Sequence, residues 1–360
     1  MVDYEIKKET VPALKSMVEN AENVAVIILL CNNPAFKISG KPYNLELCGK
    51  KMYEWVVLAV GQAKTTIVPC EITDDLISLV KPYLTNCKYT AVLYSDTPLL
   101  SKKTFLEIIE YVSIKQLNVC KLSRGYIFNT TYLKSTDKIY APQTHYFEEE
   151  DFLAVYNFKQ LAIISDILKN RILNYHMKEG VRFIDPSSTF IDADVLIGSS
   201  TVVYSNNHLL GTTQIGENCT LESGNFLVNS LINNNVTLYN SRIENSSIGN
   251  NSKINACQIT DSDIGVNTII EKSGFIADSV TGENVYFGTG VKVSNFDGKN
   301  KHKTMISDKV FIGAGSTLIA PLKIGLGAFI AAGSTITDDV PEQAFAVARA
   351  TQKNKNDWRE

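Results

Sequence analysis

The 360-residue chain lacks the features that mark several large classes of protein. Its formal net charge is −3, with 35 Lys and Arg against 38 Asp and Glu, so it has no basic excess for binding nucleic-acid phosphates. The longest apolar run, Val24 to Leu30, is far shorter than the roughly 20 residues that a membrane-spanning helix needs. We therefore expect neither nucleic acid nor a membrane among its partners.

Cysteine usage excludes two further classes. The seven cysteines are odd in number and show no Cys-x-x-Cys spacing, which fits neither a disulfide framework nor a zinc site. Most are expected to be small buried side chains. The first residues, MVDYEIKKETVPALKSMVENAEN, are too rich in charge for the apolar stretch of a signal peptide. We therefore expect a cytoplasmic protein.

What the sequence does contain is a ladder of large aliphatic residues in its second half. From Ile191 to Leu227 an aliphatic residue returns at every sixth position, and the same period returns from Ile306 to Ile336. Between them, from Ile232 to Ile270, each position recurs after sixteen residues instead of eighteen. An α-helix cannot produce such a period, whereas a parallel β-helix points one side chain inward from each short strand. The pattern predicts a left-handed parallel β-helix of hexapeptide repeats.

One segment interrupts this ladder. The stretch VSNFDGKNKHKTM, from Val293 to Met305, has no inward aliphatic rhythm and carries four lysine or histidine residues. It should therefore leave the coil as an excursion loop. Loops on a rigid scaffold are where sites are built, although a solvated excursion with no role is an equal alternative.

The N-terminal part follows a different pattern. Val24 to Leu30 and Thr90 to Tyr94 are continuous apolar runs, as expected of parallel strands buried on both faces of an α/β domain. After Phe158 apolar residues recur at helical spacing up to Gly180, which predicts a linker helix. His176 lies on this helix and is interpreted as a structural residue.

Four segments carry a resemblance to a known family: NRILNYHMKEGVRFIDPSSTFIDADVLIG, VSNFDGKNKHKT, VFIGAGSTLIAPLKIG and FIAAGSTITDDVPEQAFAVARATQKNKNDW. They closely resemble the bifunctional N-acetylglucosamine-1-phosphate uridyltransferase and glucosamine-1-phosphate acetyltransferase family (GlmU), from about Asn157 to Trp358. The match before Asn157 is sparse. The resemblance implies a Rossmann-like nucleotidyltransferase domain, a homotrimeric β-helix with acetyl-CoA bound between subunits, and a role in UDP-N-acetylglucosamine biosynthesis.

The expected organisation follows from the ladder and the resemblance together. Residues 1–157 should form a shortened nucleotidyltransferase-like α/β domain, and residues 158–180 the linker helix. Residues 181–345 should form the left-handed β-helix, as in hexapeptide acyltransferases, and residues 346–360 a C-terminal tail. The fold class is therefore α/β plus β, with a truncated nucleotide-diphospho-sugar transferase domain first.

The uridyltransferase site of the family is poorly matched. Its Gly-rich loop brings backbone amides to the nucleotide phosphates, but here Cys31 and Asn33 replace the two glycines and Ala35 replaces the basic residue. The family's uracil-binding segment has no counterpart. Asp96 matches the metal-binding aspartate, while Tyr156 aligns with its partner asparagine. A single carboxylate is a poor Mg²⁺ site, so we predict that uridyltransferase activity is absent.

The acetyltransferase site is changed at its catalytic end. The family's catalytic histidine falls on Lys272, and Phe275 and Tyr286 replace two residues that bind the sugar. A lysine has a reference pKa near 10.4 and would need a drop of roughly three units to act as a base near neutrality. His302 on the excursion loop is an alternative base that would act across a subunit boundary.

The positions that the resemblance assigns to acetyl-CoA are better retained. They are Asn295, Phe296 (a tyrosine in the family), Lys301, Ala314 (a serine in the family), Ala332 and Arg349. Arg349 would meet a CoA phosphate. The same residues could instead be retained for coil packing and trimer contacts, and the sequence gives these two interpretations equal weight.

Three functions therefore remain. The first, a working enzyme of UDP-N-acetylglucosamine synthesis, is opposed by the replaced loop and the missing histidine. The second is a hexapeptide acyltransferase that uses acetyl-CoA with a different acceptor. The third, which the sequence favours, is a catalytically silent homotrimer that binds CoA, a sugar phosphate or a partner protein.

Overall fold

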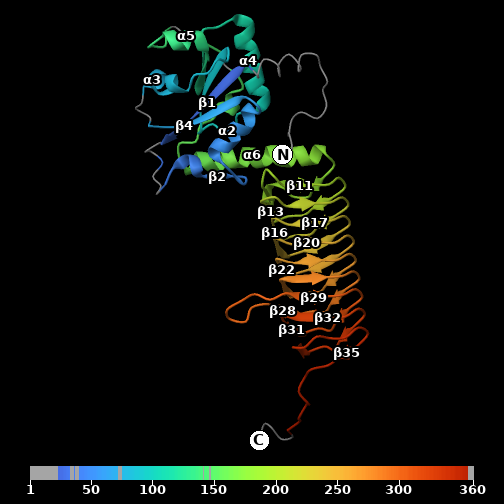
Figure 1. Ribbon diagram of the computed structural model, residues 1–360. Helices are drawn as coiled ribbons and strands as arrows, with labels where there is room; N and C mark the ends of the chain where they lie inside the picture. Colours follow the sequence, from blue (N-terminus) through green and yellow to red (C-terminus); the bar gives the residue numbers. More distant parts are fainter. Residues whose placement is uncertain are drawn as a thin grey trace. The chain divides into compact units, whose positions relative to one another are not determined.

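The computed structural model describes residues 23–32, 36, 40–71, 75–140, 142–145 and 147–355 (Figure 1). The chain divides into two compact units, Met1–Ile172 and Leu173–Glu360. None of the helices in these ranges combines the length and the apolar composition that a bilayer crossing requires.

The N-terminal unit is built on a six-stranded sheet with the order β4-β1-β5-β7-β6-β8. Its strands are β1 (Val24–Asn32), β4 (Lys64–Glu71), β5 (Tyr89–Tyr94), β6 (Val119–Leu122), β7 (Gly125–Asn129) and β8 (Gln143–Thr144). The central strand β1 runs parallel to both β4 and β5. Every side chain from Val24 to Leu29 is at most 2% exposed, which confirms the prediction of a strand buried on both faces.

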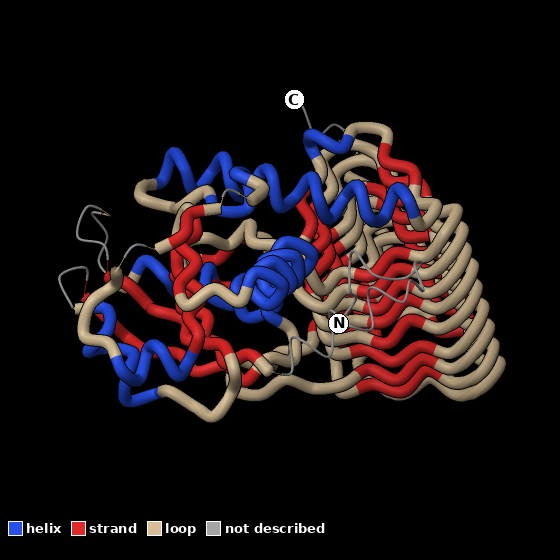
Figure 2. The backbone as a smooth tube through the Cα atoms, turned by 90° about the horizontal axis from the view of Figure 1, so that it is seen from above, coloured by secondary structure: helices blue, strands red, loops and turns tan. Residues whose placement is uncertain are grey.

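Helices cover both faces of this sheet (Figures 1 and 2). The α-helices of this unit are α2 (Met52–Val60), α3 (Leu76–Val80), α4 (Lys102–Lys115), α5 (Thr130–Ser135) and the first part of α6 (Phe158–Lys178). Short 3-10 turns occur at Pro42–Asn44, Lys81–Tyr83 and Glu149–Phe152, and β2 (Glu46–Leu47) and β3 (Lys50–Lys51) form a hairpin. Helices α2 and α4 pack on one face of β1 and β5, and α3 and α5 pack on the other. The unit is therefore a three-layer, Rossmann-like α/β domain.

The C-terminal unit is the predicted left-handed parallel β-helix. Each coil contributes one short strand to each of three parallel sheets, which contain nine, eight and ten strands. The nine-stranded sheet consists of β10 (Phe190–Ile191), β13 (His208–Leu210), β16 (Phe226–Val228), β19 (Arg242–Glu244), β22 (Gln258–Thr260), β25 (Phe275–Ala277), β28 (Lys292–Ser294), β31 (Thr317–Ile319) and β34 (Thr335–Ile336).

The three sheets form the sides of a triangular prism, and the remaining strands form its other two sides. The eight-stranded sheet consists of β11 (Leu196–Ile197), β14 (Gln214–Ile215), β17 (Leu231–Ile232), β20 (Ser247–Ile248), β23 (Asp263–Ile264), β26 (Ser279–Thr281), β29 (Thr304–Ile306) and β32 (Leu322–Ile324). The ten-stranded sheet consists of β9 (Arg182–Phe183), β12 (Val202–Val203), β15 (Thr220–Leu221), β18 (Thr237–Tyr239), β21 (Lys253–Asn255), β24 (Ile269–Ile270), β27 (Tyr286–Phe287), β30 (Phe311–Ile312), β33 (Phe329–Ile330) and β35 (Phe345–Ala346).

Two corners of the prism matter for the site. We call the turn from the ten-stranded to the nine-stranded sheet the first corner, and the turn from the nine-stranded to the eight-stranded sheet the second corner. In the sixteen-residue coils the second corner has only two residues, and the first of them has positive φ, as at Asn245 (47°) and Asp261 (50°). Asn and Asp adopt this left-handed conformation more readily than other residues with a side chain. The shortened repeat thus reflects tight corners, while the strands keep their pairing.

Candidate functional site

The excursion loop leaves the coil at the second corner, between β28 and β29 (Figure 1). It is tied back to the corners of the two preceding coils. The Asn295 side-chain amide donates to a carboxylate oxygen of Asp278 over 2.5 Å. The Lys301 ammonium lies 3.3 Å from a carboxylate oxygen of Asp261 and 3.9 Å from one of Asp278. These contacts fix the base of the loop on the rigid coil.

The same loop holds a histidine and an aspartate together. One carboxylate oxygen of Asp297 accepts hydrogen bonds from the backbone amides of Lys299 and Asn300, each over 2.7 Å. Its other oxygen lies 2.7 Å from Nε2 of His302. The amide of Asn300, then His302 and then the amide of Lys299 lower the pKa of Asp297 to about 2. Asp297 therefore stays ionised and orients the imidazole of His302, which is the arrangement of a positioned general base.

Four other predicted residues form a column at the first corner. The amide of Gly290 donates to the carbonyl of Lys272 over 2.8 Å, and the amide of Gly333 donates to the carbonyl of Ala314 over the same distance. The Arg349 guanidinium donates to the carbonyl of Ala332 over 3.0 Å. We call Lys272, Ala314, Ala332 and Arg349, with the coil turns between them, the first-corner column.

Close packing of the coils leaves few bulky side chains on the surface of the first-corner column. A Cβ on Gly288 would lie 2.5 Å from the backbone nitrogen of Ala314, and one on Gly313 would collide with the backbone nitrogen of Ala332. The coils therefore meet backbone to backbone here, and glycine and alanine leave peptide groups accessible. Such a strip suits a long ligand that lies along the coils, with the exposed guanidinium of Arg349 at its end.

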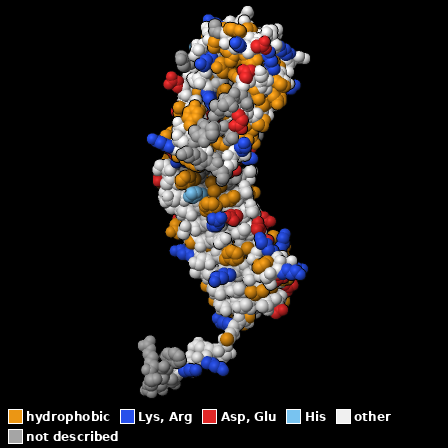
Figure 3. Space-filling view, turned by 90° about the vertical axis from the view of Figure 1, so that its left-hand side faces the viewer, with side chains coloured by type: hydrophobic (Ala, Val, Ile, Leu, Met, Phe, Trp, Pro, Cys, Tyr) orange, Lys and Arg blue, Asp and Glu red, His pale blue; other side chains and the backbone are white. Residues whose placement is uncertain are grey.

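The excursion loop and the first-corner column do not form a single site within one chain. Residues 295–302 belong to the second corner and the first-corner column to the other edge of the nine-stranded sheet, so this sheet lies between them. The space-filling view shows Lys and Arg side chains scattered over one side of the molecule, without one continuous basic field (Figure 3). Lys272 also borders an open hollow of about 370 Å³, whose other lining residues include Tyr239 and Lys253.

In the N-terminal unit, Asp96 follows β5 at the carboxyl end of the parallel strands. Both of its carboxylate oxygens are held by Arg124, whose Nε and Nη2 donate over 3.1 and 2.6 Å. No cluster of three or more His, Cys, Asp or Glu side chains suited to a metal ion occurs in the described ranges. The residues present at Asp96 therefore do not fit the Mg²⁺ ion that the family resemblance implies.

The surroundings of Asp96 include two cysteines. Cys31 at the end of β1 faces Cys70 of β4 in the parallel ladder, and their Sγ atoms are 2.7 Å apart. The hydrogen bond with Cys70, followed by burial, raises the pKa of Cys31, so its thiol stays protonated. Asn33 and Ala35 lie outside the described residues. The backbone amide of Val155 donates to the Asp96 carbonyl over 2.9 Å, which brings the neighbouring Tyr156 to this edge.

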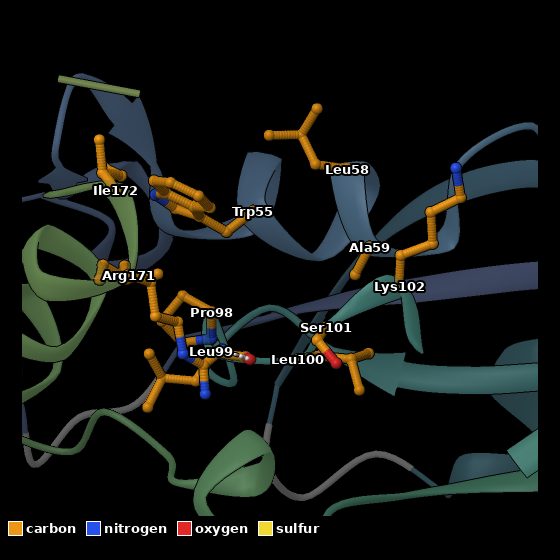
Figure 4. Close-up of a pocket in the computed structure, with 11 residues that line it drawn as sticks. Trp55, Leu58, Ala59, Pro98, Leu99, Leu100, Ser101, Lys102, Arg171 and Ile172 are labelled. Carbon is orange, nitrogen blue, oxygen red and sulfur yellow. Dashed lines mark hydrogen bonds between the residues drawn. The ribbon is translucent and has the colours of Figure 1, made fainter. Parts of the chain in front are cut away.

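A separate small pocket in the N-terminal unit contains none of the predicted site residues (Figure 4). It has a volume of about 130 Å³ and is lined mainly by apolar side chains of α2, α6 and the segment before α4, among them Trp55 and Leu99. Arg171 borders it, but the guanidinium is committed to the Leu99 carbonyl over 2.7 Å and to Glu150 and Asp151 over 2.7 and 2.9 Å. The pocket is therefore a packing feature next to a partly buried ion-pair cluster.

Comparison with curated proteins finds extensive similarity to GlmU proteins. The chain is 39% identical over 228 residues to the bifunctional protein GlmU of Clostridium kluyveri, covering 58% of this chain and 50% of the relative. It is 41% identical over 230 residues to that of Clostridium beijerinckii, covering 59% and 50%. The chain is similar to GlmU. It spans about half the length of the curated relatives it matches. No protein-family model matches it.

Solved structures give a more distant likeness. LpxA from Acinetobacter baumannii is 19% identical, covers 43% of this chain and 67% of its own, and has a TM-score of 0.36. The Arabidopsis UDP-N-acetylglucosamine acyltransferase is 22% identical, covers 46% and 64%, and has a TM-score of 0.35. At that level they carry no information about activity.

The sequence alone did not indicate three of these features. Arg124 immediately precedes β7, the strand that pairs antiparallel with β5, and no motif links it to Asp96. Asp261 and Asp278 hold the loop only because consecutive coils stack their corners. The pairing of Asp297 with His302 could have been anticipated, because both residues belong to the one segment without an inward ladder.

Proposed function

We propose that the protein is a homotrimer that binds acetyl-CoA along the first-corner column and carries no uridyltransferase activity. Its division into a shortened nucleotidyltransferase-like domain, a linker helix, a β-helix and a tail is part of this proposal. The observation that carries it is the first-corner column, in which the resemblance assigns acetyl-CoA contacts to Ala314, Ala332 and Arg349, which follow one another along the coil.

Arg349 supplies the charge for this interaction. A guanidinium has five N–H donors, and the carbonyl of Ala332 takes one of them. Arg349 is exposed and has no carboxylate partner among the residues that the structure describes. Because a planar guanidinium matches phosphate oxygens in pairs, it suits the phosphates of CoA.

We propose a trimer because the excursion loop and the first-corner column lie apart within one chain. A loop at one edge of the nine-stranded sheet and a column at the other can meet when a second copy brings its own loop to the column. A closed three-fold arrangement repeats this contact three times and leaves no unmatched surface. Asn295, Phe296 and Lys301 would then contact acetyl-CoA held by the neighbouring copy.

The absence of uridyl transfer rests on the N-terminal unit. The Asp96 carboxylate is committed to Arg124, and Cys31 stands where the family has a glycine of the phosphate loop. Among the residues that the structure describes at this edge, none then offers the combination of metal and backbone amides that holds a nucleoside triphosphate.

One observation favours a second candidate, an acetyltransferase with a different acceptor. His302 is oriented by Asp297 over 2.7 Å and could take the proton of an acceptor amine. The amine nitrogen would bond to the thioester carbonyl carbon, the carbon–sulfur bond would break, and the CoA thiolate would leave and be protonated.

Thermal unfolding with acetyl-CoA tests the binding proposal. A ligand that binds only the folded state stabilises it by about 2.7 kcal/mol at one hundred times its dissociation constant, so the melting temperature should rise. Arg349→Ala should remove most of that rise and leave the unliganded protein folded. Arg182→Ala, an exposed arginine on β9 away from the column, is the matched control and should respond like the parent. A melting temperature that stays unchanged up to millimolar acetyl-CoA would contradict the proposal.

A thiol-release assay separates the two candidates. With acetyl-CoA and glucosamine 1-phosphate or other amines, a silent binder releases no thiol above the background rate. If thiol is released, loss of about 10²-fold or more in His302→Ala would identify the base, whereas loss only in Lys272→Ala would exclude His302.

A further inference from the structure

We propose that Arg124 takes the place of a metal ion at Asp96, so that the nucleotidyltransferase-like unit carries a built-in cation and excludes divalent metals. This inference concerns the N-terminal unit alone and does not depend on acetyl-CoA binding.

The guanidinium of Arg124 engages both oxygens of the Asp96 carboxylate at once. Two N–H groups of Arg124 donate side by side, one to each oxygen of Asp96. Such a paired, charge-assisted contact is roughly twice as strong as a neutral hydrogen bond. The Asp96 side chain is only 12% exposed, so a metal ion would have to displace the guanidinium to reach it.

Aromatic rings hold the guanidinium in that position. Its central carbon lies 4.2 Å from the ring centroid of Tyr94 and 6.0 Å from that of Tyr156. A guanidinium over an aromatic face is attracted by the ring's negative face, and more so when water is partly excluded. Burial alone would lower the pKa of Arg124, but the hydrogen bonds and charge of Asp96 outweigh it and raise the pKa. The charge of Arg124 is therefore permanent.

The backbone also places Arg124 above Asp96. It occupies the turn between β6 and β7, immediately before Gly125. Gly125 has φ of 124°, and a Cβ there would lie 2.6 Å from the carbonyl oxygen of Val92 in β5. Only glycine allows β7 to approach β5 this closely, and the approach brings the preceding residue over the end of β5, where Tyr94 and Asp96 lie.

The consequence is a difference in charge and in reach. A divalent ion carries two positive charges and keeps positions open for phosphate oxygens, whereas Arg124 supplies one charge and uses its paired donors on Asp96. Removing Arg124 should expose a desolvated carboxylate and create the weak metal site that Arg124 prevents.

Mn²⁺ binding to the full-length chain, measured from the electron paramagnetic resonance signal of free Mn²⁺, tests this. The parent should show no Asp96-dependent site, Arg124→Gln should bind Mn²⁺ at least tenfold more tightly, and Asp96→Asn with Arg124→Gln should lose that gain. Lys121→Gln, an exposed charge on β6, is the control and should match the parent. A parent site that disappears in Asp96→Asn, or a folded Arg124→Gln chain with no gain, would overturn the proposal.

A second measurement applies if Arg124→Gln does not fold. The melting temperature of the parent should be the same in 10 mM Mg²⁺ as in EDTA, within about 1 °C, apart from any shift that Asp96→Asn shares. A rise with Mg²⁺ that Asp96→Asn abolishes would show that a metal reaches the carboxylate, and the proposal would be wrong.

Discussion

At the scale of single residues, the buried histidine of α6 makes the clearest energetic statement. His176 is 1% exposed and lies beside Tyr175, with Glu179 and Glu217 lining the neighbouring hollow. Burial lowers its pKa from 6.5 to about 4, so the folded protein holds it neutral. The interpretation of His176 as a structural residue agrees with this burial.

Stability should consequently fall on the acid side of neutrality. The unfolded chain binds a proton at His176 below about pH 6.5, whereas the folded chain does so only near pH 4. Between these values the unfolded state binds more protons, so the free energy of unfolding should drop by about 3 kcal/mol from pH 7 to pH 4. In urea unfolding curves at several pH values, His176→Leu should remove this part of the decline. Equal declines in both proteins would contradict the assignment.

The positions that the sequence predicted well are those set by local pattern. The inward aliphatics of the ladder, such as Ile243, Ile259 and Ile276, are 0% exposed. Arg124 could not be predicted in this way, because its role depends on an antiparallel pairing between segments more than thirty residues apart in sequence. Period and composition carry no information about such pairings.

At the scale of elements, each coil of the β-helix gains its stability from one inward side chain per strand. In β22, Ile259 is fully buried and its neighbour Gln258 is exposed. Ile259→Ala should destabilise the unit by about 2–5 kcal/mol, because it removes buried carbon and leaves a cavity. Gln258→Ala should change stability by less than about 0.5 kcal/mol. Similar shifts of the chemical unfolding midpoint in both variants would contradict the assignment of the inward face.

The excursion loop is a second element with a testable anchor. Asp278 accepts a hydrogen bond from Asn295 and lies near Lys301, so Asp278→Ala should release the base of the loop. Limited trypsin digestion should then cut after Lys299, Lys301 or Lys303 several-fold faster. Asp263→Ala, which removes an exposed carboxylate from the eight-stranded sheet, should leave the cutting rate unchanged. Equal rates in the two variants would show that the corner does not hold the loop.

The element scale is also where the sequence was most informative. The six-residue period predicted the β-helix, and the sixteen-residue period agrees with the observed pairing of Ser247 with Asp263 and of Arg242 with Gln258. The sequence predicted that the segment from Val293 to Met305 leaves the coil. It did not predict the fold-back of this loop onto Asp261 and Asp278, since that depends on which corners stack.

At the scale of the whole molecule, the two units differ in what they offer to a ligand. The N-terminal unit has a Rossmann-like sheet, and the Asp96 carboxylate at its edge is bound by Arg124. The β-helix keeps a loop and a column at opposite edges of one sheet, which a neighbouring copy could unite. We therefore expect an assembly that holds acetyl-CoA between its subunits.

Sedimentation velocity with acetyl-CoA, followed by its absorbance near 260 nm, tests assembly and binding in one measurement. We predict a species of three 39.8 kDa chains at micromolar concentration, with acetyl-CoA absorbance moving in the same boundary. In Arg349→Ala the trimer should remain while the cofactor stays behind. A boundary with the mass of a single chain, or a trimer that sediments without acetyl-CoA at millimolar ligand, would contradict the proposed acetyl-CoA-binding trimer.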